Sequence, residues 1–84
     1  AVIQDRQREL PEGSYTAQLL REGVGRIAQK VIEEAGETAL ASAQGHQDQL
    51  PGEVADLLYH LLVLLAASGV PPRAVWEELR RRRG

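Results

Sequence analysis

The sequence has no cysteine among its 84 residues, which excludes thiol catalysis, thiolate metal sites and a disulfide framework. It has no strong excess of one charge either, since the formal net charge is -2, and no global field favours nucleic acid or membranes. Its longest apolar run, 57–67, contains Tyr59 and His60 and is shorter than the roughly 20 residues that span a bilayer. The first residues, AVIQDRQREL, lack the apolar core of a signal peptide. We therefore expect a soluble, cytoplasmic protein with neither nucleic acid nor a membrane as partner.

The sequence also lacks an alternating strand pattern, an internal repeat and a low-complexity linker. Residues 1–84 are therefore expected to form one domain of the all-α class. A chain of this length buries only about 60% of the surface that its unfolded form exposes. Without disulfides, dimerisation is the expected way to complete the core of such a small helical bundle.

Helical periodicity and breaking residues divide the chain into five predicted helices, at residues 2–10, 15–22, 24–44, 53–67 and 72–82. Ser14 follows the PEG turn and is placed to cap the second of them. Gly45 is expected to end the third helix, and Asp48 to cap the fourth. Pro51 is compatible with the fourth helix only within its first turn.

The third and fourth predicted helices differ in their patterns. Small or apolar residues recur at three- and four-residue steps along the third helix: Val24, Ala28, Val31, Ala35, Ala39 and Ser42. The fourth helix is apolar around most of its circumference, and a helix of that kind is buried on nearly every side. One short chain cannot supply so many neighbours, so the fourth helix is the predicted centre of a dimer.

Acidic residues are concentrated between these two helices, in the stretch EEAGETALASAQGHQDQLPGEVAD. It holds six carboxylates, Glu33, Glu34, Glu37, Asp48, Glu53 and Asp56. No lysine or arginine occurs between Lys30 and Arg73 to offset them. Like charges three residues apart share a helix face and repel, and burying them unpaired is costly.

Antiparallel packing of the two helices would bring Glu34 and Glu37 opposite Glu53 and Asp56. Four carboxylates can bind one or two Mg²⁺ ions, and Mg²⁺ commonly binds substrate phosphates at the same time. The pattern therefore suggests phosphoanhydride hydrolysis, in which a metal stabilises phosphate oxygens and activates water. On these residues alone, a solvated acidic surface remains an equal alternative.

The chain resembles the phosphoribosyl-ATP pyrophosphohydrolase family of histidine biosynthesis, which belongs to the all-α MazG-like superfamily. The resemblance rests on PEGSYTAQLL (11–20), KVIEEAGE (30–37) and EVADLLYHLLVLLAASGV (53–70), which occur in the family's order and spacing. It implies Mg²⁺-dependent cleavage between the α and β phosphates of phosphoribosyl-ATP, giving phosphoribosyl-AMP and pyrophosphate. It also implies nucleotide (ATP-type) binding and a functional link to phosphoribosyl-AMP cyclohydrolase. The homodimer is expected separately, from the short chain and the apolar fourth helix.

The resemblance also implies roles for individual residues. Metal ligands would be Glu34, Glu37, Glu53 and Asp56, and Glu33 would be a further ligand or the base that orients water. Arg26 and Lys30 would contact substrate phosphates. Ser14, Tyr15 and Thr16 would contact the nucleotide or its phosphates, although a cap followed by a half-buried aromatic explains them equally well.

Three other features favour structural roles. His60 shares a face with the fourth helix's carboxylates but, among leucines, is expected to be a hydrogen-bonded core residue. Trp76 is expected to pack within an amphipathic last helix. The arginines at 80–83 are expected to be a solvated tail that complements the helix dipole.

Two further functions agree with the same residues. One is a pyrophosphohydrolase of the same superfamily that removes non-standard nucleoside triphosphates, because the carboxylates do not encode the base. The other is a non-catalytic helical dimerisation module whose acidic residues keep it soluble. Substrate preference separates the two enzymes, and removal of one carboxylate separates both from the module.

Overall fold

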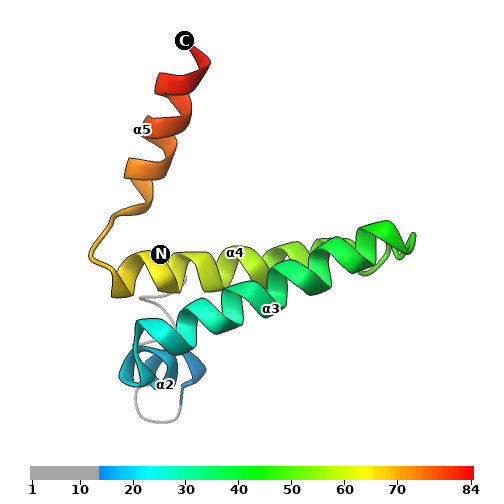
Figure 1. Ribbon diagram of the computed structural model, residues 1–84, viewed down its shortest axis with the longest axis horizontal. Coiled ribbons are helices and arrows are strands. Elements are labelled where there is room, and N and C mark those ends of the chain that lie inside the picture. Colours follow the sequence, from blue (N-terminus) through cyan, green and yellow to red (C-terminus); the bar gives the residue numbers. More distant parts are fainter. Residues whose placement is uncertain (1–13) are drawn as a thin grey trace.

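A computed structural model describes residues 14–84 of the chain, and these residues form an all-α fold (Figure 1), as the sequence predicts. They contain no strand and four helices, namely α2 (Tyr15–Glu22), α3 (Val24–Ala43), α4 (Leu50–Ala67) and α5 (Pro72–Arg83). Helix α4 begins three residues earlier than expected. The predicted helix at residues 2–10 and the turn at 11–13 lie outside the described residues.

Helix α2 begins with the predicted cap. The Ser14 hydroxyl accepts a hydrogen bond from the backbone N–H of Ala17 at 2.9 Å, which satisfies one of the free donors of the first turn. Gly23 separates α2 from α3 with a φ of 97°, a conformation that glycine adopts without steric cost. Gly25 lies inside α3 and does not interrupt it.

Helices α3 and α4 form an antiparallel hairpin that occupies the length of the molecule (Figure 1). Gly45 ends α3 as predicted, with a φ of 77°, and the His46 N–H donates to the Ala41 carbonyl at 2.9 Å. The prediction that Asp48 caps α4 is wrong, because the N-cap residue is Gln49 and no side chain caps the helix. Pro51 does lie in the first turn of α4, where its missing N–H costs no hydrogen bond.

Helix α3 does not bury the small-residue face that its sequence suggests. Its buried residues are Ile27, Glu34 and Ala41, which follow one another at seven-residue steps and face α4. Val24 and Ala35, from the small-residue face, are exposed in the single chain. The face of α3 that is buried against α4 therefore contains the carboxylate of Glu34 and is not the small-residue face.

The apolar core lies where α2 crosses the open end of the hairpin. Leu19, Ile27 and Val63 form its fully buried centre, one residue from each of α2, α3 and α4. Most of α4 remains only partly covered, and Leu58 is 52% exposed. With 18 residues and a mean hydropathy of 1.5, α4 satisfies the length and composition criteria of a membrane span, as core helices of soluble proteins also do. The predicted burial of α4 on nearly every side is not achieved within one chain.

Helix α5 leaves the end of α4 steeply and projects away from the hairpin (Figure 1). Gly69, with a φ of 73°, makes the turn between them. The prediction that Trp76 packs within the last helix is wrong for the single chain, because its side chain is 57% exposed. The reason is the direction of α5, which projects away from the hairpin instead of packing along it (Figure 1).

Candidate active site

Three carboxylates meet between the middle of α3 and the first turns of α4. Glu34, Glu37 and Glu53 each place an oxygen within 4.8 Å of the other two. The one-turn spacing of Glu34 and Glu37 and the antiparallel hairpin produce this cluster, as the sequence predicts. We call these three residues the carboxylate cluster.

The carboxylate cluster has the properties of a cation site. Glu34 is 8% exposed, and its Oε2 atom is buried without a hydrogen-bond partner among the described residues. A buried acceptor without a partner costs roughly 1–3 kcal/mol, and more when it is charged. A hard cation with oxygen ligands would satisfy that atom and offset the repulsion between the three charges. The residues present therefore fit a divalent metal ion.

Thr38 connects the two helices beside the cluster, a role that the sequence analysis missed. Its hydroxyl lies 2.8 Å from the Glu34 carbonyl and 3.1 Å from the Glu53 carbonyl, and it can donate its one hydrogen to either. Thr38 thus holds the backbone of a residue on each side of the cluster. A single threonine at a half-buried helix position carries no sequence signal that would have revealed this.

Lys30 is the cation beside the carboxylate cluster. Its Nζ atom lies 3.4 Å from Glu33 Oε1 and 3.7 Å from Glu34 Oε1. Desolvation acts to lower the pKa of Lys30, but the neighbouring Tyr15 and the two glutamates outweigh it and raise the pKa. Lys30 is therefore charged at neutral pH and offsets part of the negative charge of the cluster through its ion pair with Glu34.

Mutual repulsion changes the titration of Glu37. The negative charge of Glu34 is the main cause that raises the pKa of Glu37 above its ordinary value of 4.5, and desolvation and Glu53 add to it. The folded chain therefore holds a proton on Glu37 more tightly than the unfolded chain does. This carboxyl group contributes stability at low pH that is lost as the pH rises past 4.5 and through the folded-state pKa.

We expect a corresponding pH dependence in the metal-free protein. Between pH 4.5 and neutral pH, the Tm of the wild type, measured in EDTA, should fall relative to the Tm of Glu37→Gln. Thermal denaturation of both proteins at matched ionic strength checks this. An identical pH dependence of the two proteins would show that repulsion at Glu37 does not contribute.

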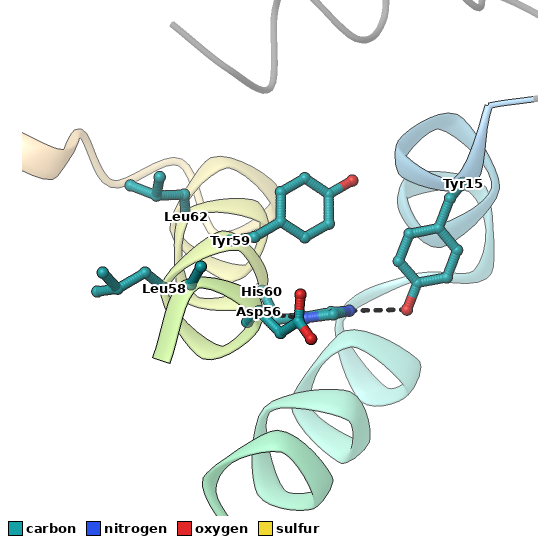
Figure 2. A pocket seen from close by; sticks show the side chains of 7 residues that line it. Tyr15, Asp56, Leu58, Tyr59, His60 and Leu62 are labelled. Atoms are coloured by element: carbon teal, nitrogen blue, oxygen red, sulfur yellow. Dashed lines mark hydrogen bonds between the residues drawn. The ribbon is translucent and has the colours of Figure 1, made fainter. Parts of the chain in front are cut away.

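Asp56, one turn after Glu53, is not part of the carboxylate cluster and instead lines a neighbouring pocket of about 510 Å³. Tyr15, Tyr59 and His60 form the aromatic side of this pocket (Figure 2). The Tyr15 and Tyr59 rings are stacked, with centroids 6.2 Å apart and planes inclined by 25°. The pocket thus combines a carboxylate with two aromatic rings immediately beside the cluster.

Buried His60 joins α2 to α4 at the base of this pocket through two hydrogen bonds. Its Nδ1 atom lies 2.7 Å from the Asp56 carbonyl, and since a carbonyl only accepts, Nδ1 carries the hydrogen. In the neutral ring Nε2 then accepts from the Tyr15 hydroxyl, also at 2.7 Å (Figure 2). His60 is 5% exposed, so it is the hydrogen-bonded core residue that the sequence favours.

The remaining residues singled out in the sequence occupy different environments. Ser14 and Thr16 are buried, and the Thr16 hydroxyl bonds to that of Tyr59. Tyr59 was missed in the sequence analysis, where its only signal is a polar atom within a leucine-rich helix. Arg26 is exposed on α3, four residues before Lys30, and pairs with Glu22 at 3.5 Å.

Known proteins resemble this chain over almost its whole length. The sequence profile described as phosphoribosyl-ATP pyrophosphohydrolase matches residues 1–83. A phosphoribosyl-ATP pyrophosphatase of Azospirillum brasilense is 50% identical over 84 residues, covering 100% of this chain and 76% of the relative. One from Metallosphaera sedula is 52% identical over 81 residues, covering 96% and 87%. One from Paramagnetospirillum magneticum is 54% identical over 83 residues, covering 99% and 76%.

Proposed function

The chain belongs to the phosphoribosyl-ATP pyrophosphohydrolase family, and from this we propose that it hydrolyses phosphoribosyl-ATP with Mg²⁺ bound at the carboxylate cluster. The family assignment makes it a hydrolase of histidine biosynthesis. The observation that best supports the metal is the buried, unpartnered Oε2 atom of Glu34 beside two further carboxylates. Mg²⁺ is the expected ion because hard oxygen donors and a phosphate substrate suit it.

We assign Glu34, Glu37 and Glu53 as the residues that hold the metal, with Asp56 completing the set from the adjacent pocket. When bound, Mg²⁺ would neutralise charge on the substrate phosphates and lower the pKa of water. The protein's part is to hold the ligands in place. Thr38 does so through the backbone of Glu34 and Glu53, and His60 through the carbonyl of Asp56.

The reaction adds water across one phosphoanhydride bond. The water oxygen bonds to phosphorus, and the bond between the α and β phosphates breaks to release pyrophosphate and phosphoribosyl-AMP. Glu33 is our candidate for orienting the water and accepting its proton, because it is more exposed than Glu34 and lies beside the cluster rather than within it. The ion pair between Lys30 and Glu33 would hold the Glu33 carboxylate, the proposed proton acceptor, on the same side of α3 as Lys30.

Substrate binding is assigned to residues on both sides of the cluster. Lys30 and Arg26 are the nearest cations on α3 and are proposed to contact phosphates. Tyr15 lines the aromatic pocket and is proposed to contact the nucleotide. Ser14 and Thr16, whose hydroxyls make hydrogen bonds inside the fold, are proposed to support this contact by orienting the start of α2.

The active form is proposed to be a cytoplasmic homodimer. Only Leu19, Ile27, Ala41 and Val63 are buried apolar residues among those described, which is a small core for 84 residues. The partly exposed leucines of α4 would be covered by a second chain. The product, phosphoribosyl-AMP, gives the functional link to phosphoribosyl-AMP cyclohydrolase.

The decisive assay is pyrophosphate release with Mg²⁺, comparing phosphoribosyl-ATP with ATP, dUTP and dCTP. We expect rapid turnover of phosphoribosyl-ATP alone, complete loss in EDTA and recovery on adding excess Mg²⁺. Preference for a simple triphosphate would instead indicate the nucleotide-cleaning activity of the superfamily. Folded protein that turns over none of the four would support the dimerisation module.

A further inference from the structure

The pocket beside Asp56 offers a ligand both aromatic surface and a carboxylate. Tyr15, Tyr59 and His60 supply its aromatic side, and Asp56 is the only charged residue that lines it. Its volume of about 510 Å³ lies within the usual range of small-molecule sites. Figure 2 shows that Tyr59, Asp56 and His60 leave α4 on the side of α2, from which Tyr15 extends to meet them. The pocket is therefore a candidate for the part of the active site that holds the substrate.

An apolar groove of about 360 Å³ is a second cavity along α4, and its chemistry differs. Leu61, Leu65 and Trp76 are among its lining residues, none of which is charged. Leu58 and Leu62 border both cavities, and they leave α4 on the side opposite to that of the aromatic pocket residues (Figure 2). The groove matches apolar surface alone, so a substrate that carries phosphates is expected in the pocket beside Asp56 and not in the groove.

Every polar atom of the three rings already has a hydrogen-bond partner inside the protein. The Tyr15 hydroxyl donates to His60 Nε2, and His60 Nδ1 donates to the Asp56 carbonyl, each at 2.7 Å. The Tyr59 hydroxyl bonds to the hydroxyl of Thr16, which is fully buried. His60 also packs edge-on against Tyr15 and Tyr59, with ring centroids 5.5 and 5.1 Å away. The rings are thus held in place, and they present carbon surface to the pocket in place of hydrogen-bonding groups.

The purine base is the part of phosphoribosyl-ATP that matches such a surface. Its faces are flat and aromatic, whereas the ribose and phosphate groups of the substrate are polar or charged. Bases stack on aromatic side chains, and stacking discriminates little between bases because every base has a π-face. The phosphates would then extend toward the carboxylate cluster, because Asp56 lies one helical turn after Glu53.

We propose that the pocket beside Asp56 binds the purine base of the substrate by stacking on Tyr15 and Tyr59, and that His60 and Thr16 are the positioning residues that hold these two rings. This inference rests on the proposed function, which places the substrate phosphates at the carboxylate cluster. It specifies how that site binds the nucleotide: the protein contacts the faces of the base and does not read its hydrogen-bonding edge. Buried His60 and Thr16 act on binding through the tyrosines, without contacting the base themselves.

Three ligands that share a triphosphate but differ in the base test this assignment. ATP and ITP differ only at the hydrogen-bonding edge of the purine, and inorganic tripolyphosphate has no base. Calorimetric titration of the protein in Mg²⁺ should give Kd values for ATP and ITP within about threefold of each other. Tyr15→Leu and Tyr59→Leu should each weaken ATP binding by about tenfold or more, because stacking is lost, and leave tripolyphosphate binding unchanged.

Amide substitutions of His60 test its positioning role. The amide of asparagine lies near the place of Nδ1 and that of glutamine near the place of Nε2, so only His60→Gln retains a partner for Tyr15. His60→Asn should weaken ATP binding about fivefold, the effect of one lost hydrogen bond, and His60→Gln should bind ATP as the wild type does. The double variant with Tyr15→Phe should bind ATP no more weakly than His60→Asn alone. Thr16→Val and Tyr59→Phe repeat the test at the second ring.

Four results would overturn the inference. ATP bound at least about tenfold more tightly than ITP would show that the edge of the base is read. Equal loss of ATP and tripolyphosphate binding in the leucine variants would show that the rings support the site as a whole and not the base. ATP binding that is absent from the wild type or unchanged in both leucine variants would place the base elsewhere. Additive losses in the double variant would mean that His60 does not act through Tyr15.

Ile32→Ala is the control for removal of an exposed apolar side chain. Ile32 is 72% exposed on α3 and lies outside the pocket, so this variant should bind all three ligands as the wild type does. Failure of the wild-type enzyme to turn over phosphoribosyl-ATP would refute the proposed function. The binding results would stand apart from that failure, because they do not depend on turnover.

Discussion

Replacement of Glu37 by glutamine is expected to lower kcat/KM for phosphoribosyl-ATP by at least about a hundredfold and to leave the helices intact. Glu37 contributes one of the three oxygens that approach within 4.8 Å of one another, and an amide cannot replace a carboxylate as a charged ligand. Its side chain is exposed and makes no hydrogen bond to the core, so the fold does not depend on it. A loss of charge here therefore acts on the site and not on the structure.

The stability of the same variant provides an independent measurement. Because Glu34 and Glu53 repel Glu37, its neutralisation should maintain or increase the Tm of the metal-free protein. Mg²⁺ should raise the Tm of the wild type and raise that of Glu37→Gln much less, since a ligand that binds only the folded state stabilises it. Thermal denaturation with and without Mg²⁺, beside the turnover assay, gives both results from one preparation.

Asp48→Asn is the matched control, because it removes another acidic charge from the same stretch. Asp48 lies in the turn before α4, is exposed and caps nothing, so its loss should change neither turnover nor the response to Mg²⁺. Full activity of Glu37→Gln would remove Glu37 from the ligand set. Equal damage from Asp48→Asn would point to a general effect of charge and not to a specific site.

The sequence was sufficient to predict those parts of the fold that depend on local chemistry. Ser14 is followed at once by a helix, and Gly45 can adopt a positive φ that most residues avoid, so both boundaries are determined within a few residues of the chain. The clustering of Glu34 and Glu37 with Glu53 was also predictable. It needs only two helices joined by a short turn and carboxylates at one-turn spacing.

Predictions that depend on helix orientation were less successful. The small-residue face of α3 and the buried line through Glu34 differ by a rotation of the helix about its axis, and periodicity alone cannot select between them. Trp76 was expected to pack because α5 is amphipathic, but the partner for its apolar face is not in the described chain. Tyr59 and Thr38 escaped notice because their hydrogen bonds join residues far apart in sequence.

A glutamate in place of Leu61 is expected to dissociate the dimer and to unfold much of the chain. Leu61 lines the apolar groove but not the pocket beside Asp56, so the change leaves the proposed ligands untouched. In a dimer that covers this groove, a glutamate at position 61 would be buried among leucines without a partner for its charge. Burial of an unpaired charge costs roughly 3–5 kcal/mol, which corresponds to a rise in the dimer Kd of about a thousandfold.

Unfolding should follow dissociation because the single chain has so little core of its own. Sedimentation equilibrium would show the monomer, and circular dichroism at the same concentrations would show the loss of helix. Ile32→Glu is the control, since Ile32 is 72% exposed on α3 and outside the groove. A surface change of that kind alters stability by no more than about 0.5 kcal/mol, so this variant should remain a folded dimer.

The two variants together also test why α4 is apolar on nearly every side. If Leu61→Glu remained dimeric, the groove would not be the interface and α4 would need another explanation. If it became a folded, stable monomer, the core around Leu19, Ile27 and Val63 would be sufficient without a partner. Coupled loss of dimer and helix is the result expected when one helix is both the wall of the active site and the core that two chains share.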